Sequence, residues 1–322
     1  MTRSPSGEGE STLPDPTSLE LTMGGVKLVS FVFTIALYTR EPLSRHGPAL
    51  VALQQRYFEL CSDVSGWLYG TENMNRHKPA NTRTLGMIAT WTKPNAPARE
   101  FMALDIKNGV FNGAPEHKFQ IRGTEPGSAP YEGGDANLVV LDFPASWGHL
   151  RVDDLHRLAL DMFGGMPIVS GHAGFALEVS PYMQTGAEVH GLLRSLRHCG
   201  VDLNRPSEDR RAVAGDGLKT VGWLTALGPQ AVDELGGAAK LAKGLGAGAT
   251  LIPMSSGAVF QAGPRPEAGD RNRRDNLPAY RAVFERVRPL IERTADRTSA
   301  VWVGGAPDPD RTREWLLRLA QP

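Results

Sequence analysis

The spacing of apolar residues changes from strand-like to helix-like along the first half of the chain. Residues 26–38 form a run rich in β-branched and aromatic side chains, which predicts a buried strand. Beyond Pro42, apolar residues recur every three or four positions as far as Leu60, so we expect a helix there. Four shorter β-prone runs follow, separated by proline, glycine and asparagine, and they predict an antiparallel sheet: 85–92, 101–106, 118–122 and 137–143.

The middle of the chain predicts a helix, a strand and another helix in that order. Asp153 or Asp154 can cap a helix that ends at Gly164, where two glycines stop the apolar pattern. Residues 170–179 then read as a strand. Apolar residues spaced by threes and fours predict the helix that follows, which reaches Leu196.

A second block with the same order of elements follows a polar stretch. Its first strand is predicted over 218–227, and one or two further strands are predicted over 250–261. The clearest helical face of the chain runs over 277–291, and a last helix begins near Pro309. Strand, helix and strands thus occur twice, without a letter-by-letter repeat.

These patterns predict an α+β protein built from two sequential strand–helix–strands blocks. We expect mostly antiparallel sheets with helices packed on one face. The expected segments are a flexible tail at 1–24, an N-terminal α+β block at 25–200, a linker at 201–217 and a C-terminal α+β block at 218–322.

Composition narrows the class of protein. The 322 residues include 35 basic and 35 acidic side chains, and this balance argues against a surface built to attract nucleic acid or a membrane. Cys61 and Cys199 lie far apart without a second pair, so neither a disulfide framework nor a zinc site is expected. Residues 1–24 lack the apolar core of a secretory signal, and we therefore expect a cytoplasmic protein.

Histidines supply the candidates for catalysis. His149, Asp153, Asp154 and His156 form the densest group of metal-ligand types, although capping of a helix start explains the acidic pair equally well. His172 alternates with apolar neighbours on a predicted strand, where Glu178 is a candidate carboxylate partner. A metal- or histidine-dependent hydrolase or nucleotide-modifying enzyme is the alternative that these residues leave open.

Arginines and one tryptophan supply the candidates for binding. Arg271, Arg273 and Arg274 precede a predicted helix, where such a cluster can hold a phosphate or a carboxylate. Acidic residues are interspersed, so a solvated face with salt bridges is the simpler interpretation, and a nucleic-acid-binding module is disfavoured. Trp147 lies in a predicted turn and can serve as an exposed anchor for a partner.

Three passages resemble a known family. They are residues 220–225 (TVGWLT), 259–266 (VFQAGPRP) and 269–281, in this order and at this spacing. They resemble the type VI secretion immunity family, the TsiV-like group of bacterial proteins. The N-terminal block is similar more loosely, so the resemblance covers residues 25–322.

The resemblance implies a protein that binds one cognate toxin effector and blocks it, by occlusion and without catalysis. From the residues we expect no cofactor, no metal and no catalytic residue, and neither nucleic acid nor a membrane is an expected partner. Because no secretory signal is visible, the toxin is expected to act in the cytoplasm. The sequence leaves open whether two copies of the chain form a homodimer. For the interface we expect exposed residues on irregular segments, namely Tyr131, Glu132, Asp135, Trp147, Arg273 and Arg274.

Overall fold

A computed structural model describes residues 13–97, 99–125, 135–181, 184–246, 248–297, 302–303 and 306–321. Its strands are β1 (Leu21–Met23), β2 (Val26–Thr39), β3 (Leu68–Thr71), β4 (Lys78–Pro79), β5 (Phe101–Lys107), β6 (Lys118–Thr124), β7 (Asn137–Pro144), β8 (Ser170–Val179), β9 (Asp202–Asn204), β10 (Leu224–Leu227), β11 (Ala249–Met254), β12 (Gly257–Ala262), β13 (Trp302–Val303) and β14 (Ala306–Pro307).

The α-helices within the same residues are α1 (Pro16–Leu19), α2 (Gly47–Leu60), α3 (Thr82–Leu85), α4 (Met87–Trp91), α5 (Trp147–Leu150), α6 (Val152–Gly165), α7 (Gln184–Arg197), α8 (Pro206–Val213), α9 (Pro229–Glu234), α10 (Ala238–Ala242), α11 (Pro278–Ala295) and α12 (Pro309–Leu316). Short 3₁₀ turns lie at Leu43–His46, Arg271–Arg273 and Arg318–Ala320.

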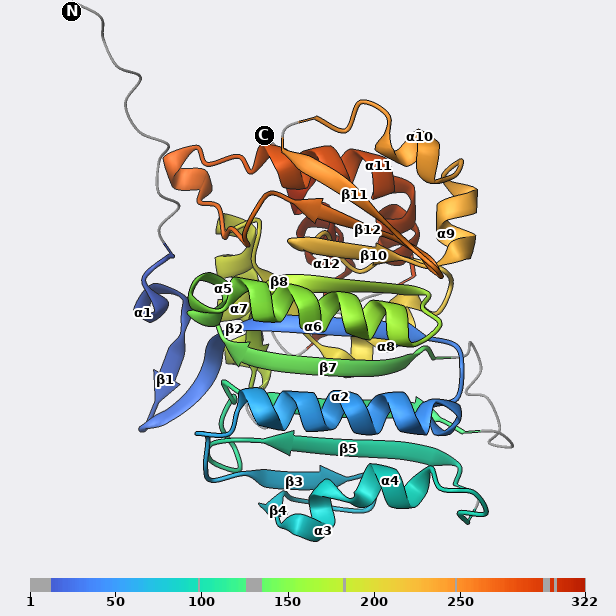
Figure 1. Ribbon diagram of the computed structural model, residues 1–322. Coiled ribbons are helices and arrows are strands. Elements are labelled where there is room, and N and C mark those ends of the chain that lie inside the picture. The colour runs from blue at the N-terminus through green and yellow to red at the C-terminus, as the bar shows by residue number, and fades with distance from the viewer. Residues whose placement is uncertain are drawn as a thin grey trace, which may run out of the picture.

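One large sheet organises the molecule (Figure 1). Across the described residues its order is β11-β12-β10-β8-β2-β7-β6-β5-β3-β4, with β1 beside β2 and β9 beside β8. The pairs are antiparallel except β8 with β9, which are parallel. The expected α+β class with mostly antiparallel pairing is confirmed.

Strands from both expected blocks share this sheet, because β10 pairs with β8 on one side and with β12 on the other. Residues 201–217, expected as a linker, carry β9 and α8, and part of the expected tail carries α1 and β1. The 25–200 and 218–322 segments are therefore joined edge to edge.

Helices lie on both faces of the sheet (Figure 1), whereas the sequence predicted helices on one face only. In Figure 1, α2 and α6 lie in front of the central strands, and α8 and α11 lie behind the sheet. Phe163 of α6 lies near Gly171 of β8 on the first face, whereas Val213 of α8 packs with Tyr38 and Val140 on the second. The two faces carry different chemistry, since the second face also holds most of the buried charges described below.

Two predicted strands were wrong in type or length. Residues 85–92 were expected as a strand but form the end of α3 and all of α4, because Asn81 and Thr84 make a capping box that starts a helical turn. The strand expected over 218–227 is limited to β10. The backbone turns before it, where Thr225 Oγ1 accepts a hydrogen bond from the Gly222 N–H.

Candidate partner-binding site

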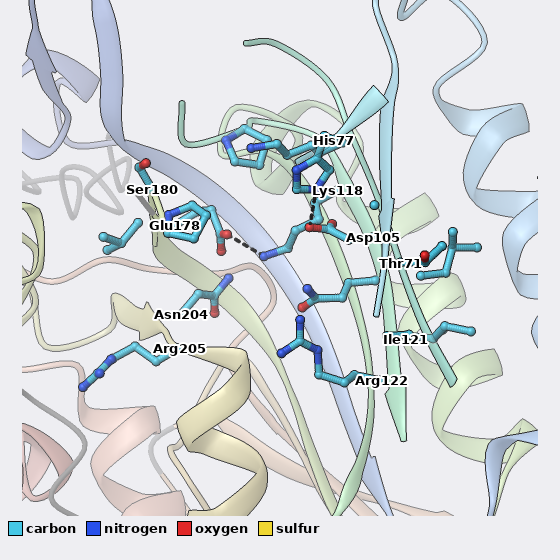
Figure 2. Close-up of a pocket in the computed structure, with 18 of the residues that line it drawn as sticks. Thr71, His77, Asp105, Lys118, Ile121, Arg122, Glu178, Ser180, Asn204 and Arg205 are labelled. Atoms are coloured by element: carbon cyan, nitrogen blue, oxygen red, sulfur yellow. Dashed lines mark hydrogen bonds and ion pairs between the residues drawn. The ribbon is translucent and has the colours of Figure 1, made fainter. Parts of the chain in front are cut away.

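A polar hollow opens on the second face of the sheet, next to α8 (Figure 2). Strands β5 and β6 form its floor, and Glu178 of β8, Asn204 of β9 and Arg205 form the opposite wall. Its volume is about 290 Å³. This size suits one or two side chains of a partner, because pockets for drug-sized ligands occupy about 300–1,000 Å³.

Strand periodicity places charged side chains on the floor of the hollow. Along β6, Lys118, Gln120 and Arg122 face the hollow, whereas Phe119 and Ile121 are fully buried in the core on the other face. On neighbouring β5, Asp105 and Lys107 line the hollow together with Ala103, whereas Met102 and Ile106 are fully buried in the core. An open sheet face bearing fixed charges results.

Lys118 is the centre of a buried ion-pair network. Its Nζ lies 2.6 Å from Glu178 Oε1 and 3.0 Å from Asp142 Oδ2. Asn204 Nδ2 donates to Asp142 Oδ1 at 3.2 Å and to Thr34 Oγ1 at 3.3 Å. Burial raises the pKa of Glu178 to about 7. The charge of Lys118 opposes this shift, and the negative charge of Asp142 adds to it.

A second pair fixes the far side of the floor. His77 Nε2 lies 3.0 Å from Asp105 Oδ2. Burial works against ionisation of Asp105, but the hydrogen bond and charge of His77, together with the charges of Lys118 and Lys107, outweigh it and lower the pKa of this carboxyl. Lys107 Nζ donates to the carbonyls of Phe111 and Gly113, each at 3.0 Å, and burial lowers its pKa.

The wall and rim carry further arginines. Arg205 lies 3.4 Å from Glu188 and 3.6 Å from Glu208. The guanidinium of Arg122 ends inside the hollow in Figure 2. Such an arrangement offers several rigid hydrogen-bond donors and acceptors to an entering side chain. Across the described part of the chain, no group of three or more His, Cys, Asp or Glu residues could hold a metal ion.

His172 is shut inside the protein. It is 1% exposed, and its Nε2 lies 3.5 Å from Asp202 Oδ2. Burial lowers the pKa of His172 to about 3, so the ring is neutral at pH 7. Because the side chain is enclosed, a substrate cannot reach it. The carboxylate partner proposed from the sequence was wrong: Glu178 lies six residues further along β8, about 20 Å away at the rise of a strand.

The residues around His149 do not converge on one point. His149 stacks on Phe175, whereas His156 Nε2 lies 3.2 Å from Gln261 Oε1. Asp154 pairs with two arginines of its own segment, Arg151 and Arg157. Each of these polar groups has a separate structural partner, and they form no common site.

The chain matches a known protein family over most of its length. A family model described as type VI immunity for VRR-NUC, named TsiV, matches residues 52–319. The chain belongs to the TsiV family. The resemblance drawn from the three sequence passages is thereby confirmed, and TsiV is a family of type VI immunity proteins.

The fold of this TsiV-family chain is similar to that of a solved protein. The Pseudomonas aeruginosa T6SS protein PA0821 superposes with a TM-score of 0.79, covering 95% of this chain and 88% of that chain. The sequences are 20% identical, so the likeness shows the fold. None of the curated proteins matches this chain.

The described residues expected at the interface lie in three separate places. Trp147 begins α5 and is half-buried, stacking on Phe143 with Arg151 over its ring. Asp135 precedes β7 and lies 3.9 Å from Arg210. The two residues are thus at opposite ends of β7, about 26 Å apart along eight strand residues. Tyr131 and Glu132 lie outside the described residues.

Arg273 and Arg274 lie in the turn before α11. The side chain of Arg273 is 79% exposed and lies 3.8 Å from Asp270, and Arg274 adopts a left-handed backbone with φ of 59°. Arg271, their neighbour, instead donates to Arg318 O and to Gln321. The arginine cluster therefore divides into one residue that binds the C-terminus of the described chain and two exposed residues.

The sequence pattern did not indicate the hollow. The pattern of Lys118, Gln120 and Arg122, alternating with Phe119 and Ile121, was visible as a strand but not recognised as a charged face. Its partners Glu178 and Asn204 come from strands much later in the chain. Only the strand order brings them together.

Proposed function

We propose that the chain neutralises a type VI effector carrying a VRR-NUC nuclease domain by binding it and covering the surface that receives its substrate. The match to the family of type VI immunity for VRR-NUC over residues 52–319 carries this proposal. A nuclease acts on nucleic acid, and the cell's chromosome lies in the cytoplasm, so we place the encounter there. No described helix is long and apolar enough to cross a membrane.

Occlusion without catalysis is the mechanism that the described side chains favour. The histidine alternatives do not assemble a reactive site, because His172 is enclosed and His149 and His156 have separate partners. By contrast, the surface offers a polar hollow and exposed cations such as Arg273. Specific protein interfaces combine such pockets with complementary charge.

Titration of the effector's nuclease activity distinguishes a binding inhibitor from an enzyme. Increasing amounts of this chain are added to a fixed amount of effector, and cleavage of a DNA substrate is followed. We expect inhibition to be complete at a stoichiometric ratio and proportionally weaker below it. Full protection by a small fraction of an equivalent would show catalytic inactivation and contradict the proposal.

Growth of cells provides the matching test in vivo. Cells that express the effector alone should die, and co-expression of this chain in the cytoplasm should restore growth and yield a complex. Rescue only by a version exported to the periplasm would contradict the cytoplasmic encounter.

The interface residues are tested by substitution. We expect Trp147→Ala, Asp135→Asn and the double change Arg273→Gln with Arg274→Gln each to weaken binding of the effector, as would Tyr131→Ala with Glu132→Gln. Glu292→Gln on α11 is the control, because this exposed carboxylate pairs only with Arg288 among the described residues. Affinities equal to that of the control for all variants would remove these residues from the interface.

A further inference from the structure

Gln120 carries an amide group without a hydrogen-bond partner at the floor of the hollow. The residue is 7% exposed and lines the cavity from β6. Its Oε1 is buried without a partner, and no hydrogen bond joins its Nε2 to a residue that the structure describes. A buried amide left in this state costs free energy, so folded proteins usually supply the missing bonds from water or a ligand. A group that enters the hollow can therefore provide hydrogen bonds that the chain itself does not.

The register of the sheet explains why Gln120 has no partner. On β6 it lies between Asp105 of β5 and Val140 of β7. Val140 has an apolar side chain and offers no hydrogen bond. Asp105 is held by another residue, since its Oδ2 lies 3.0 Å from His77 Nε2. The strand neighbours on both sides thus leave the amide of Gln120 to the cavity.

The acidic side chains around the hollow are already paired with basic ones. Each acidic lining residue lies within 3.6 Å of a basic side chain of the described chain: Glu178 of Lys118, Asp105 of His77, and Glu188 and Glu208 of Arg205. Lys118 also pairs with the fully buried Asp142. A charged occupant would have to compete with one member of these pairs, and a buried charge that loses its partner is costly. A neutral polar group enters without this competition.

We propose that the hollow receives a neutral amide side chain of the VRR-NUC effector, an asparagine or a glutamine, which pairs with the amide of Gln120. This inference rests on the proposed function and identifies the chemistry by which the partner is recognised. An amide offers an N–H₂ donor and a carbonyl acceptor, which complement the same two groups of Gln120. The terminal torsion of a glutamine is broad, so Gln120 can turn to present both groups. A cavity of about 290 Å³ has room for one such side chain.

The test measures, by calorimetry, the affinity for the VRR-NUC effector whose nuclease activity this chain inhibits. Gln120→Met keeps the length of the side chain and removes the amide. Binding should weaken about five- to a hundredfold, because the amide of the effector is then buried without its partner. The melting temperature of the free variant should be equal or higher, since an unpartnered buried amide is lost. Gln55→Met is the matched control, because Gln55 is exposed on α2, on the other face of the sheet (Figure 1), and its affinity should be unchanged.

Two further measurements identify the occupant. Gln120→Glu keeps the shape of the side chain but replaces the N–H₂ donor with a charged acceptor, and it should also weaken binding; tighter binding would reveal a basic occupant and overturn the inference. In the effector, each asparagine, glutamine and charged residue is replaced by alanine in turn. One amide residue should lose affinity for the unchanged chain and lose no more when combined with Gln120→Met, which shows that the two groups are coupled. Coupling of Gln120 to a charged residue instead would contradict the inference.

The inference and the proposed function fail in different ways. If Gln120→Met binds within about twofold of the unchanged chain, the inference is overturned while the proposed function stands, and the hollow holds only water. A lower melting temperature together with that unchanged affinity would assign Gln120 a purely structural role. If the unchanged chain neither binds nor inhibits a VRR-NUC effector, the proposed function itself fails and the inference fails with it. Circular dichroism of each variant verifies that the fold is retained.

Discussion

Lys219 Nζ lies 2.7 Å from Asp202 Oδ2, and this fully buried ion pair connects the segment before β10 to β9. The same ammonium group lies 2.7 Å from Asp209 Oδ2 of α8. One cation thus supports two buried carboxylates on separate elements. These contacts lie where sequence analysis expected a linker, so the region that joins the two halves is part of the core.

Replacing Lys219 with Met should destabilise the protein by about 3–5 kcal/mol, because the buried carboxylates of Asp202 and Asp209 lose the cation nearest to them. Urea unfolding followed by circular dichroism measures the change. Lys240→Met on the exposed side of α10 is the control and should have little effect. A loss below about 1 kcal/mol for Lys219→Met would mean that Asp202 and Asp209 are neutral in the folded protein.

Glu178 should make stability depend on pH near neutrality. Burial raises its folded pKa to about 7, above an unfolded value of about 4.3. Between these values the folded state holds a proton that the unfolded state releases, so the free energy of unfolding falls as pH rises. The charged groups that face it are Lys118, Asp142, Asp105 and Lys107, from three neighbouring strands.

The Glu178→Gln variant removes the titrating carboxyl, while groups distant from it titrate equally in both proteins. From pH 5 to pH 8 the original protein should lose up to about 3 kcal/mol of stability relative to the variant. Chemical unfolding at several pH values provides the comparison. A relative gain in stability with rising pH would show that the pull of Lys118 lowers the pKa of Glu178 instead.

Gly222 lies in one of the sequence passages that carry the family resemblance, and the backbone packs closely against it. A Cβ added at Gly222 would lie 2.6 Å from the Ala173 carbonyl oxygen and 3.1 Å from that of Leu224, and neither backbone atom can move away cheaply. We expect Gly222→Ala to cost about 1–3 kcal/mol, as overpacking does elsewhere.

Gly186 is the matched control for that substitution. It is exposed in α7, and an added Cβ would meet no heavy atom within 4 Å. Gly186→Ala should be neutral or stabilise by up to about 1 kcal/mol, because alanine favours helix. Thermal unfolding of both variants tests the contrast. Equal melting temperatures would show that the backbone around Gly222 relaxes.

Periodicity was sufficient for the long elements. The 14 residues of β2 and the 18 of α11 were predicted in type because each buries a continuous apolar face. The short segment around Ile88 was predicted as a strand and is helical, because the capping box at Asn81 outweighs the β-propensity of its residues. Local hydrogen bonds decide the type of short elements.

The hollow could not be predicted from the sequence, for a different reason. Lys118, Glu178 and Asn204 belong to β6, β8 and β9, and nothing in their spacing shows that these strands approach one another. Moreover, β9 lies in a polar stretch that composition alone describes as a linker. Strand order, which local patterns do not encode, is what creates this site.

Arg318 provides the last prediction, because it connects the C-terminal 3₁₀ turn to the buried ion pairs of Lys219 and Asp202. Its guanidinium donates to the Cys199 carbonyl and to Thr220 Oγ1, each at 3.0 Å, and lies 3.7 Å from Asp202. Arg318→Met should destabilise by about 3–5 kcal/mol, since acceptors in the core lose their donor.

Coupling with Lys219 makes the test sharper. Both cations face Asp202, so the double variant with Lys219→Met should lose a different amount than the two single losses together, by about 0.5–3 kcal/mol. Arg313→Met on α12, whose exposed side chain pairs with Asp296, is the control and should combine additively with Lys219→Met. Strict additivity of Arg318→Met and Lys219→Met would mean that the two cations act on Asp202 independently. The C-terminal turn would then not belong to the network of buried ion pairs around Asp202.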